Sequence, residues 1–339
     1  MSPIPFDSLP LSRHAVDRDH VSRSRPALFD ELWEEPSTRV LALWKGRALL
    51  TAESVEAATP AADGWGSSTA GGAALDLLPV ERVTSALVRV YLGRTLVASE
   101  REPVGTAVVL EVLTDAAAQE LEPDEARWGN LRTVATALTD RDAGLFTEAL
   151  AIANWHASHT HCPRCGTPTV VEQAGWVRRC FEDGSEVFPR TDPAVIVTVL
   201  DADDRLLLGS NAMWENSRYS LLAGFVEPGE SFESAVQREI FEEAGIRVVD
   251  PQYKGSQPWP FPASVMVGFT ARLADDQSPT GLAPDGEEIL DLRWFSRAEL
   301  WDAREQVILP GRSSIARALI EDWYGGSLDE PPAEPSAAP

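Results

Sequence analysis

The sequence predicts an α+β protein built from successive structural units. Short runs of apolar and β-branched residues, interrupted by glycine turns, dominate the first 155 positions. All three cysteines lie between positions 162 and 180, and strand-like and helix-like patterns are mixed after position 190. The predicted segments are a β-rich N-terminal domain (1–155), a small cysteine-bearing module (156–190), an α/β sandwich (191–326) and a disordered tail (327–339).

Strand patterns in the N-terminal domain come in pairs. The run RVLALWKGRALL (39–50) predicts two short strands around a Lys45-Gly46 turn. VRVYLGRTLVAS (88–99) predicts the same arrangement around Gly93, and AVVLEVL (107–113) predicts one more strand.

The other segments of this domain connect or close the strands. The first 35 residues lack a clear period and are expected to be irregular, and residues 59–76 are rich in Gly, Ser and Ala, which predicts a mobile loop. The apolar spacing over 143–158 predicts a helix. Nothing in this domain indicates catalysis.

The C-terminal unit mixes strands and helices, as an α/β sandwich does. Its predicted strands cover residues 193–201, 205–211, 265–273 and 290–296. Its predicted helices cover residues 231–244, a short segment that begins at Ser296, and residues 313–326.

Composition excludes several classes of protein. The net charge of −24 argues against a general electrostatic grip on nucleic acid or anionic lipid. No apolar run is long enough to span a bilayer, and no signal-like segment follows Met1. Three clustered cysteines are too few for a disulfide framework and favour local metal binding. We therefore expect a cytoplasmic protein without a membrane partner.

The segment GFVEPGESFESAVQREIFEEAGI (224–246) places acids on the apolar side of a helix. On a helical wheel, Glu239 and Glu243 fall inside the apolar arc and Glu242 lies at its edge. The residues expected to pack this face on a sheet are Phe232, Ala235, Val236 and Ile240. Ionised carboxylates in such a place are costly unless they are paired or bound to a cation.

Three carboxylates at i, i+3 and i+4 suit Mg²⁺ or Mn²⁺ far better than zinc. Arg238 beside them can hold one carboxylate in place. The alternative is a solvated acidic helix with i,i+4 pairs.

This segment resembles the Nudix box, G-x5-E-x7-R-E-U-x-E-E-x-G-U with U aliphatic. Every position is matched, by Gly224, Glu230, Arg238, Glu239, Ile240, Glu242, Glu243, Gly245 and Ile246. The resemblance implies an α/β/α sandwich that hydrolyses a nucleoside diphosphate linked to another moiety. It further implies that Glu239, Glu242 and Glu243 bind the catalytic metal. Glu230 and Arg238 would support the loop and orient these carboxylates.

A second motif, SQPWPFPAS (256–264), contains three prolines and two large aromatics. It cannot form a helix and is a poor central strand. It resembles the array that marks the NADH pyrophosphatase branch of the Nudix hydrolases, which implies that Gln257, Trp259 and Phe261 bind substrate. The alternatives are a rigid loop that packs on its own domain and a dimer contact.

The resemblance extends to four further residues. It implies that Glu288 is an additional metal ligand or the base for the attacking water, with Glu287 and Asp291 as neighbours that could be confused with it. It also implies that Phe225 and Phe188 sandwich adenine, Phe188 across a dimer. The backbone at Ala316 would line the pocket.

The cysteine module resembles the zinc ribbon of the same branch, CxxC-x14-CxxC, although aspartate stands at the fourth position. Aspartate is a legitimate zinc ligand. The preferred set is Cys162, Cys165, Cys180 and Asp183, with His161, His159 and Glu182 as substitutes, and loss of the metal is the alternative. In either case the module is structural.

Together these motifs predict a homodimeric enzyme that uses Mg²⁺ or Mn²⁺ to hydrolyse NAD(H) to NMN(H) and AMP, with structural zinc. Removal of NAD caps from RNA 5′ ends is the same bond cleavage in a larger substrate, with Arg178 and Arg179 as candidate RNA contacts. The alternatives are a broader pyrophosphatase acting on ADP-ribose or dinucleoside polyphosphates, and an inactive nucleotide sensor.

Overall fold

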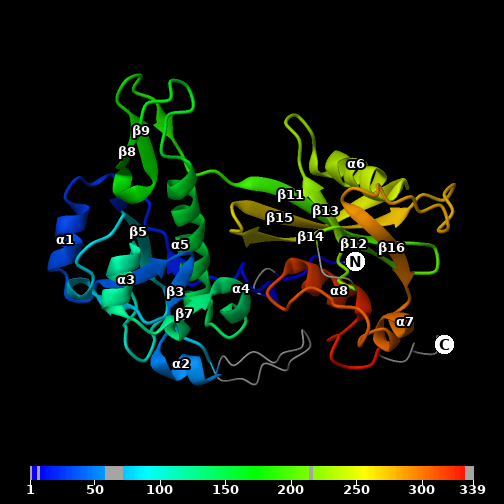
Figure 1. The fold of residues 1–339 in the computed structure, drawn as a ribbon, viewed down its shortest axis with the longest axis horizontal. Coiled ribbons are helices and arrows are strands. Elements are labelled where there is room, and N and C mark those ends of the chain that lie inside the picture. Colours follow the sequence, from blue (N-terminus) through cyan, green and yellow to red (C-terminus); the bar gives the residue numbers. More distant parts are fainter. Residues whose placement is uncertain (1, 6–7, 58–71, 214–216, 333–339) are drawn as a thin grey trace.

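Two mixed sheets, each packed between helices, form the two large parts of the molecule (Figure 1). The computed structural model describes residues 2–5, 8–57, 72–213 and 217–332. The loop predicted over 59–76 lies mostly outside the described residues. The α+β fold class is confirmed.

The N-terminal sheet has the order β1-β5-β6-β2-β3-β7, and β4 pairs with β2. Its strands are β1 (Val16–Asp17), β2 (Arg39–Trp44), β3 (Arg47–Leu49), β4 (Leu78–Pro79), β5 (Val88–Thr95), β6 (Ala107–Val112) and β7 (Trp128–Asn130). Its helices are α1 (Leu28–Glu34), α2 (Ala52–Ala57), α3 (Asp115–Leu121), α4 (Leu131–Val134) and α5 (Asp140–Ser158), with 3-10 turns η2 (Ser22–Ser24), η3 (Val80–Arg82) and η4 (Glu125–Arg127).

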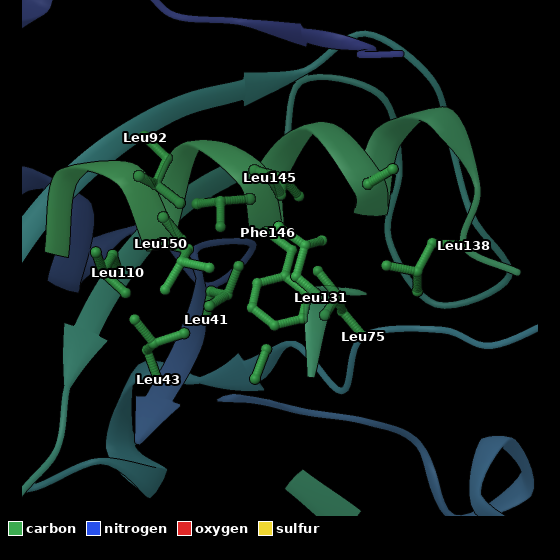
Figure 2. Close-up of a cluster of buried hydrophobic side chains, with 14 of the residues drawn as sticks. Leu41, Leu43, Leu75, Leu92, Leu110, Leu131, Leu138, Leu145, Phe146 and Leu150 are labelled. Atoms are coloured by element: carbon green, nitrogen blue, oxygen red, sulfur yellow. The ribbon is translucent and has the colours of Figure 1, made fainter. Parts of the chain in front are cut away.

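Helix α5 covers one face of this sheet. Its side chains Leu145, Phe146 and Leu150 point into a cluster with Leu41 and Leu110 from the strands, as Figure 2 shows. The helix begins at an N-cap threonine, whose side chain accepts a hydrogen bond from the Asp142 amide. The predicted helix is therefore confirmed, with its start one turn earlier.

Two expectations for this domain are wrong. Residues 88–99 do not form a strand pair, because β5 runs through Gly93 as a single strand with a bulge. A Cβ at Gly93, which has φ +130°, would lie 2.1 Å from the Asp17 carbonyl oxygen. The first 35 residues are not irregular throughout, since α1 buries Leu28 and Leu32 against the sheet.

The cysteine module is a small three-stranded antiparallel sheet with the order β10-β9-β8. It comprises β8 (Thr169–Glu172), the turn η5 (Gln173–Gly175), β9 (Val177–Cys180) and β10 (Glu186–Val187). It follows α5 in the chain and projects beside one end of that helix (Figure 1).

The C-terminal sheet has the order β14-β15-β11-β12-β16, and β13 pairs with β11. Its strands are β11 (Asp192–Leu200), β12 (Leu206–Asn211), β13 (Leu222–Phe225), β14 (Val248–Trp259), β15 (Ser264–Leu273) and β16 (Ile289–Phe295). Its helices are α6 (Phe232–Ala244), α7 (Arg297–Asp302) and α8 (Ile315–Tyr324). Helix α6 packs on one face and α8 on the other, so the predicted sandwich is confirmed.

The start of the chain packs on this C-terminal sandwich. Leu9 is fully buried in the core around α8. The amide of Ile4 donates to the Lys254 carbonyl at 2.7 Å, and the buried Lys254 ammonium donates to the Ser2 carbonyl at 2.6 Å. Lys254 also pairs with Asp322 at 2.8 Å. The first residues therefore connect the two large parts.

The tail is ordered further than expected. Leu328 is buried in the core around α8, and the Asp329 carboxylate pairs with Arg312 and Arg317. A single apolar residue in a polar segment is a weak sequence signal, which explains the error. Residues 333–339 of the predicted tail lie outside the described residues.

Candidate active site

Helix α6 has the predicted amphipathic packing, with one exception. Ala235, Val236 and Ile240 are fully buried against the sheet, whereas Phe232 in the first turn is 41% exposed. The prediction that Phe232 packs on the sheet is wrong, because this first residue of α6 lies outside the apolar cluster that buries the later turns. Gly245 ends the helix in the left-handed conformation, with φ +69°.

Glu239 lies directly over strand β13. A Cβ at Gly224 would lie between 2.0 and 2.3 Å from the carboxyl atoms of Glu239. The glycine therefore lets this carboxylate approach the strand backbone. Burial raises the pKa of Glu239, against the lowering effect of the Arg238 guanidinium.

Arg238 joins the loop and the helix. Its guanidinium donates to both oxygens of Glu230 at 2.9 and 2.8 Å, to Glu239 at 2.8 Å and to Glu242 at 2.9 Å. It also donates to the Phe225 carbonyl at 2.9 Å. These bonds raise the pKa of Arg238, with the Glu230 bond as the largest cause. The arginine thus fixes the geometry of three carboxylates.

Glu243 is the most deeply buried of these acids. It is 5% exposed, and its Oε2 has no hydrogen-bond partner among the residues that the structure describes. Burial raises its pKa to about 8, and the negative charges of Glu288, Glu239 and Asp285 add to this effect. An unpartnered buried oxygen surrounded by negative charge is a position that a divalent cation fits.

Glu288 approaches this cluster from the loop before β16. Asp285 holds the loop by accepting hydrogen bonds from the amides of Glu287, Glu288 and Ile289 at 3.1, 3.0 and 2.8 Å. The Glu288 carboxylate accepts a hydrogen bond from the Asn211 side chain at 3.3 Å. Neither Asp285 nor Asn211 was predicted, since no sequence pattern links a single amide in β12 to a distant loop.

The predicted aromatic and backbone contacts differ in exposure. Phe225, at the end of β13, and Phe188, after β10, are 59% and 58% exposed. Both rings are therefore accessible to a ligand. Ala316 is buried at the start of α8, where its amide donates to the Ser314 side chain at 3.2 Å.

Gln257 does not have the accessibility that a substrate contact needs, and its predicted role requires correction. Its side chain is fully buried, donates to the Ser313 carbonyl at 3.0 Å and accepts from the Leu11 amide at 3.4 Å. It thereby joins three distant segments. Its neighbours in SQPWPFPAS form the end of β14, which is an edge strand, as the prolines require.

Trp259 and Phe261 pack on the N-terminal domain. Their rings meet edge-to-face at 4.9 Å between centroids and contact the cluster under α5. The Arg132 guanidinium lies 4.9 Å from the Trp259 ring centroid and 3.9 Å from that of Phe261. The Asn154 amide donates to the Pro260 and Pro262 carbonyls at 3.0 Å each. The motif therefore joins the two large parts of the molecule.

We expect Trp259→Ala to lower the free energy of unfolding by about 2 kcal/mol, because a half-buried indole leaves the contact between the two parts. Urea unfolding measures this loss. The matched variant Phe241→Ala removes a ring that is 56% exposed and should change stability by less than about 0.5 kcal/mol. Equal stabilities of the two variants would contradict the assignment.

The cysteine module brings its predicted ligands together. The Sγ atoms of Cys162, Cys165 and Cys180 and a carboxylate oxygen of Asp183 all lie within 4.8 Å of one another. A hydrogen bond from Ser185 is the largest cause that lowers the pKa of Cys162 to about 7 and that of Asp183 to about 2. Three thiols and a carboxylate are a donor set that zinc accepts.

The carboxylates at α6 lie farther apart than the four candidate ligands of the cysteine module do. Within the described ranges, the cysteine module is the only group of three or more potential ligands gathered this tightly. Of the predicted RNA contacts, Arg178 is buried and bonds to Thr169, whereas Arg179 is 32% exposed and pairs with Glu172 and Glu186 at 2.7 and 2.5 Å.

Comparison with known proteins covers nearly the whole chain. Residues 190–317 match the NUDIX domain, residues 157–188 the NADH pyrophosphatase zinc ribbon domain, and residues 37–155 the NADH pyrophosphatase-like rudimentary NUDIX domain. The chain is 40% identical over 282 residues to the NAD-capped RNA hydrolase NudC of Mycobacterium bovis, which covers 78% of this chain and 88% of that protein. The chain belongs to the NADH pyrophosphatase branch of the Nudix hydrolases.

This Nudix hydrolase also resembles more distant proteins. It is 35% identical over 200 residues to the human NAD-capped RNA hydrolase NUDT12, over 55% of this chain and 42% of that protein. A crystal structure of a NUDIX hydrolase from Nitrosomonas europaea is 21% identical, with a TM-score of 0.39, over 50% of this chain and 94% of that one. Among the described helices, none is long and apolar enough to cross a membrane.

The Nudix match to the N-terminal domain was not predicted from the sequence. A complete box marks only the C-terminal sandwich, so the related fold of the N-terminal sheet had no motif to reveal it. Both sheets nevertheless carry helices on both faces.

Proposed function

We propose that this Nudix hydrolase cleaves the pyrophosphate of NAD(H) to NMN(H) and AMP and also removes NAD caps from RNA 5′ ends. The observation that carries the proposal is the buried Glu243 Oε2 beside Glu239 and Glu288, which has no hydrogen-bond partner in the part of the chain that the structure describes. The family supports the substrate, since the M. bovis and human relatives bear the name NAD-capped RNA hydrolase.

The roles of the individual residues follow from their positions. Glu239, Glu242, Glu243 and Glu288 would hold Mg²⁺ or Mn²⁺, which when bound neutralises and polarises the pyrophosphate. Arg238 and Glu230 orient these carboxylates. We propose that Glu288, which is exposed, also accepts a proton from the attacking water. Phe225 offers a ring face to the adenine.

AMP release tests the substrate directly. We expect a higher kcat/KM for NADH and NAD-capped RNA than for ADP-ribose or dinucleoside polyphosphates, in the presence of Mg²⁺ or Mn²⁺. Equal values for all four would favour a broader pyrophosphatase. Saturable binding of NADH without AMP release would instead show a nucleotide sensor.

We further propose that the module binds structural zinc and that the protein acts as a homodimer. The exposed rings of Phe181 and Phe188 on the module support a contact with a second copy. Light scattering should give twice the mass of the chain. The three thiols gathered without a disulfide support a reducing, cytoplasmic location.

Replacing the one carboxylate of the zinc set provides a specific test. We expect Asp183→Cys to keep one zinc per chain and to resist a chelator longer, because a thiolate is a softer ligand. Cys165→Ser should lose most of the zinc, whereas Thr167→Ser beside it should not. Zinc content by atomic emission, together with the melting temperature, distinguishes these outcomes. A wild-type protein free of zinc after metal-replete expression would refute the site.

A further inference from the structure

A cavity of about 590 Å³ lies between the two large parts of the molecule, away from the α6 carboxylates. Helix α5 forms one wall with Gly144, Thr147, Glu148, Ala151 and Ile152. The segment 11–18, the segment 189–191 and the ends of β14 and β15 form the others. Its size is that of sites for small organic ligands, which span about 300–1,000 Å³.

Two polar side chains of α5 line this cavity, and each has one oxygen without a hydrogen-bond partner among the described residues. Glu148 and Thr147 are 6% and 5% exposed. Neither Glu148 Oε1 nor Thr147 Oγ1 takes part in a hydrogen bond within the part of the chain that the structure describes. Burial raises the pKa of Glu148 to about 7, against the effect of Arg18 and Arg23. Buried polar atoms are rarely left unpaired, so these two indicate a ligand that pairs with them.

The mouth of the cavity is positively charged. Glu148 is its single acid, whereas Arg13, Arg18 and Arg190 line it as cations. Arg13 is committed to Asp140 and to the Leu138 and Ala135 carbonyls. Arg18 Nε lies 3.5 Å from Glu148 Oε2, and Arg190 Nε pairs with Asp192 at 2.5 Å. Both side chains are nevertheless 60% and 64% exposed, so the other N–H groups of each guanidinium can meet an anion.

An aromatic wall completes the lining. The Trp176 indole donates to the Tyr91 carbonyl at 2.8 Å, and the Arg23 guanidinium lies 3.6 Å from its ring centroid. The ring is thereby held in place. Ile152 and Val16 supply aliphatic surface beside it. A planar ring finds apolar contact here and polar partners at Glu148 and Thr147.

We propose that this cavity is a second nucleotide site, which binds a mononucleotide apart from the catalytic carboxylates. An N–H group of the base or carboxamide bonds to Glu148 and Thr147, the ring lies against Trp176, and the phosphate meets Arg18 and Arg190. A bare anion leaves Glu148 Oε1 unpaired, and a simple cation meets two arginines. A nucleotide offers an N–H group to Glu148 and Thr147 and a phosphate to the arginines. The proposal does not depend on the reaction that the Nudix site catalyses.

Calorimetric titration with AMP and with NMN tests this site in the full chain. We expect two equivalents of at least one of them to bind wild-type protein. The double variant Thr147→Val/Glu148→Gln should lose one equivalent, and Arg18→Gln should weaken that equivalent about tenfold or more. Arg47→Gln, an exposed arginine on β3, is the matched control and should bind as wild type does.

The same variants must keep their fold and their catalytic site. Unchanged kcat for NADH hydrolysis by Thr147→Val/Glu148→Gln shows that both are intact, whatever the titration gives. A single equivalent in wild type, unaltered by the double variant, would overturn the proposal and leave water as the occupant. Inorganic phosphate that competes fully for the second equivalent would show an anion site instead, and would also overturn it.

Discussion

Glu239→Gln should lower kcat for AMP release from NADH by at least about 10²-fold, without loss of stability. The amide keeps the shape of the side chain but removes the charge that a divalent cation requires. The fold should tolerate the change, because burial already disfavours the ionised carboxylate. Steady-state kinetics and a thermal melt measure the two effects.

Glu233→Gln is the matched control for this variant. Glu233 lies in the first turn of the same helix and is exposed. Its substitution should leave kcat unchanged. Near-wild-type turnover by Glu239→Gln would remove Glu239 from the site, and a melting temperature several degrees lower would make the kinetic result uninformative until a second carboxylate is tested.

Gly224→Ala should lower kcat by a similar factor through geometry alone. The new methyl group would lie 2.0 Å from the Glu239 carboxyl carbon, so the flexible end of that side chain must move away. The backbone need not move, since Gly224 pairs with Val195 in an extended ladder. We therefore expect loss of activity with little loss of stability, measured by the same two assays.

Gly311→Ala serves as the control, because a Cβ there would meet no atom within 4 Å. A second comparison tests the mechanism. If Gly224 acts only by admitting the Glu239 carboxylate, Gly224→Ala should have little further effect in a Glu239→Gln background. Full additivity of the two effects would show that the glycine has another role.

Helix α6 could be predicted from sequence because its information is local. The period of α6 places Ala235, Val236 and Ile240 inside and brings Glu239 and Glu243 with them. The same holds for the cysteine module, whose four candidate ligands lie within residues 162–183 of the chain. Short spacing, together with the fixed period of the helix in α6, is enough to predict which side chains lie together in these two places.

Gln257 shows what local information leaves out. Its motif identifies the family, yet its contacts are the Leu11 amide and the Ser313 carbonyl, far away in sequence. Arg178 and Arg179 differ from Gln257, because their partners on β8 and β10 lie only seven to nine positions away, and what the sequence does not report is the strand pairing that brings them together. Neither periodicity nor composition reports which distant segment covers a side chain.

The contact between the first residues and the C-terminal sandwich imposes an order on biosynthesis. The hydrogen bond from the Leu11 amide to the Gln257 side chain can form only after the 246 positions that separate the two residues have been synthesised. At roughly 5–20 residues per second, this interval lasts on the order of 10–50 s. During that time Leu9 lacks the apolar cluster around α8 that buries it in the folded protein.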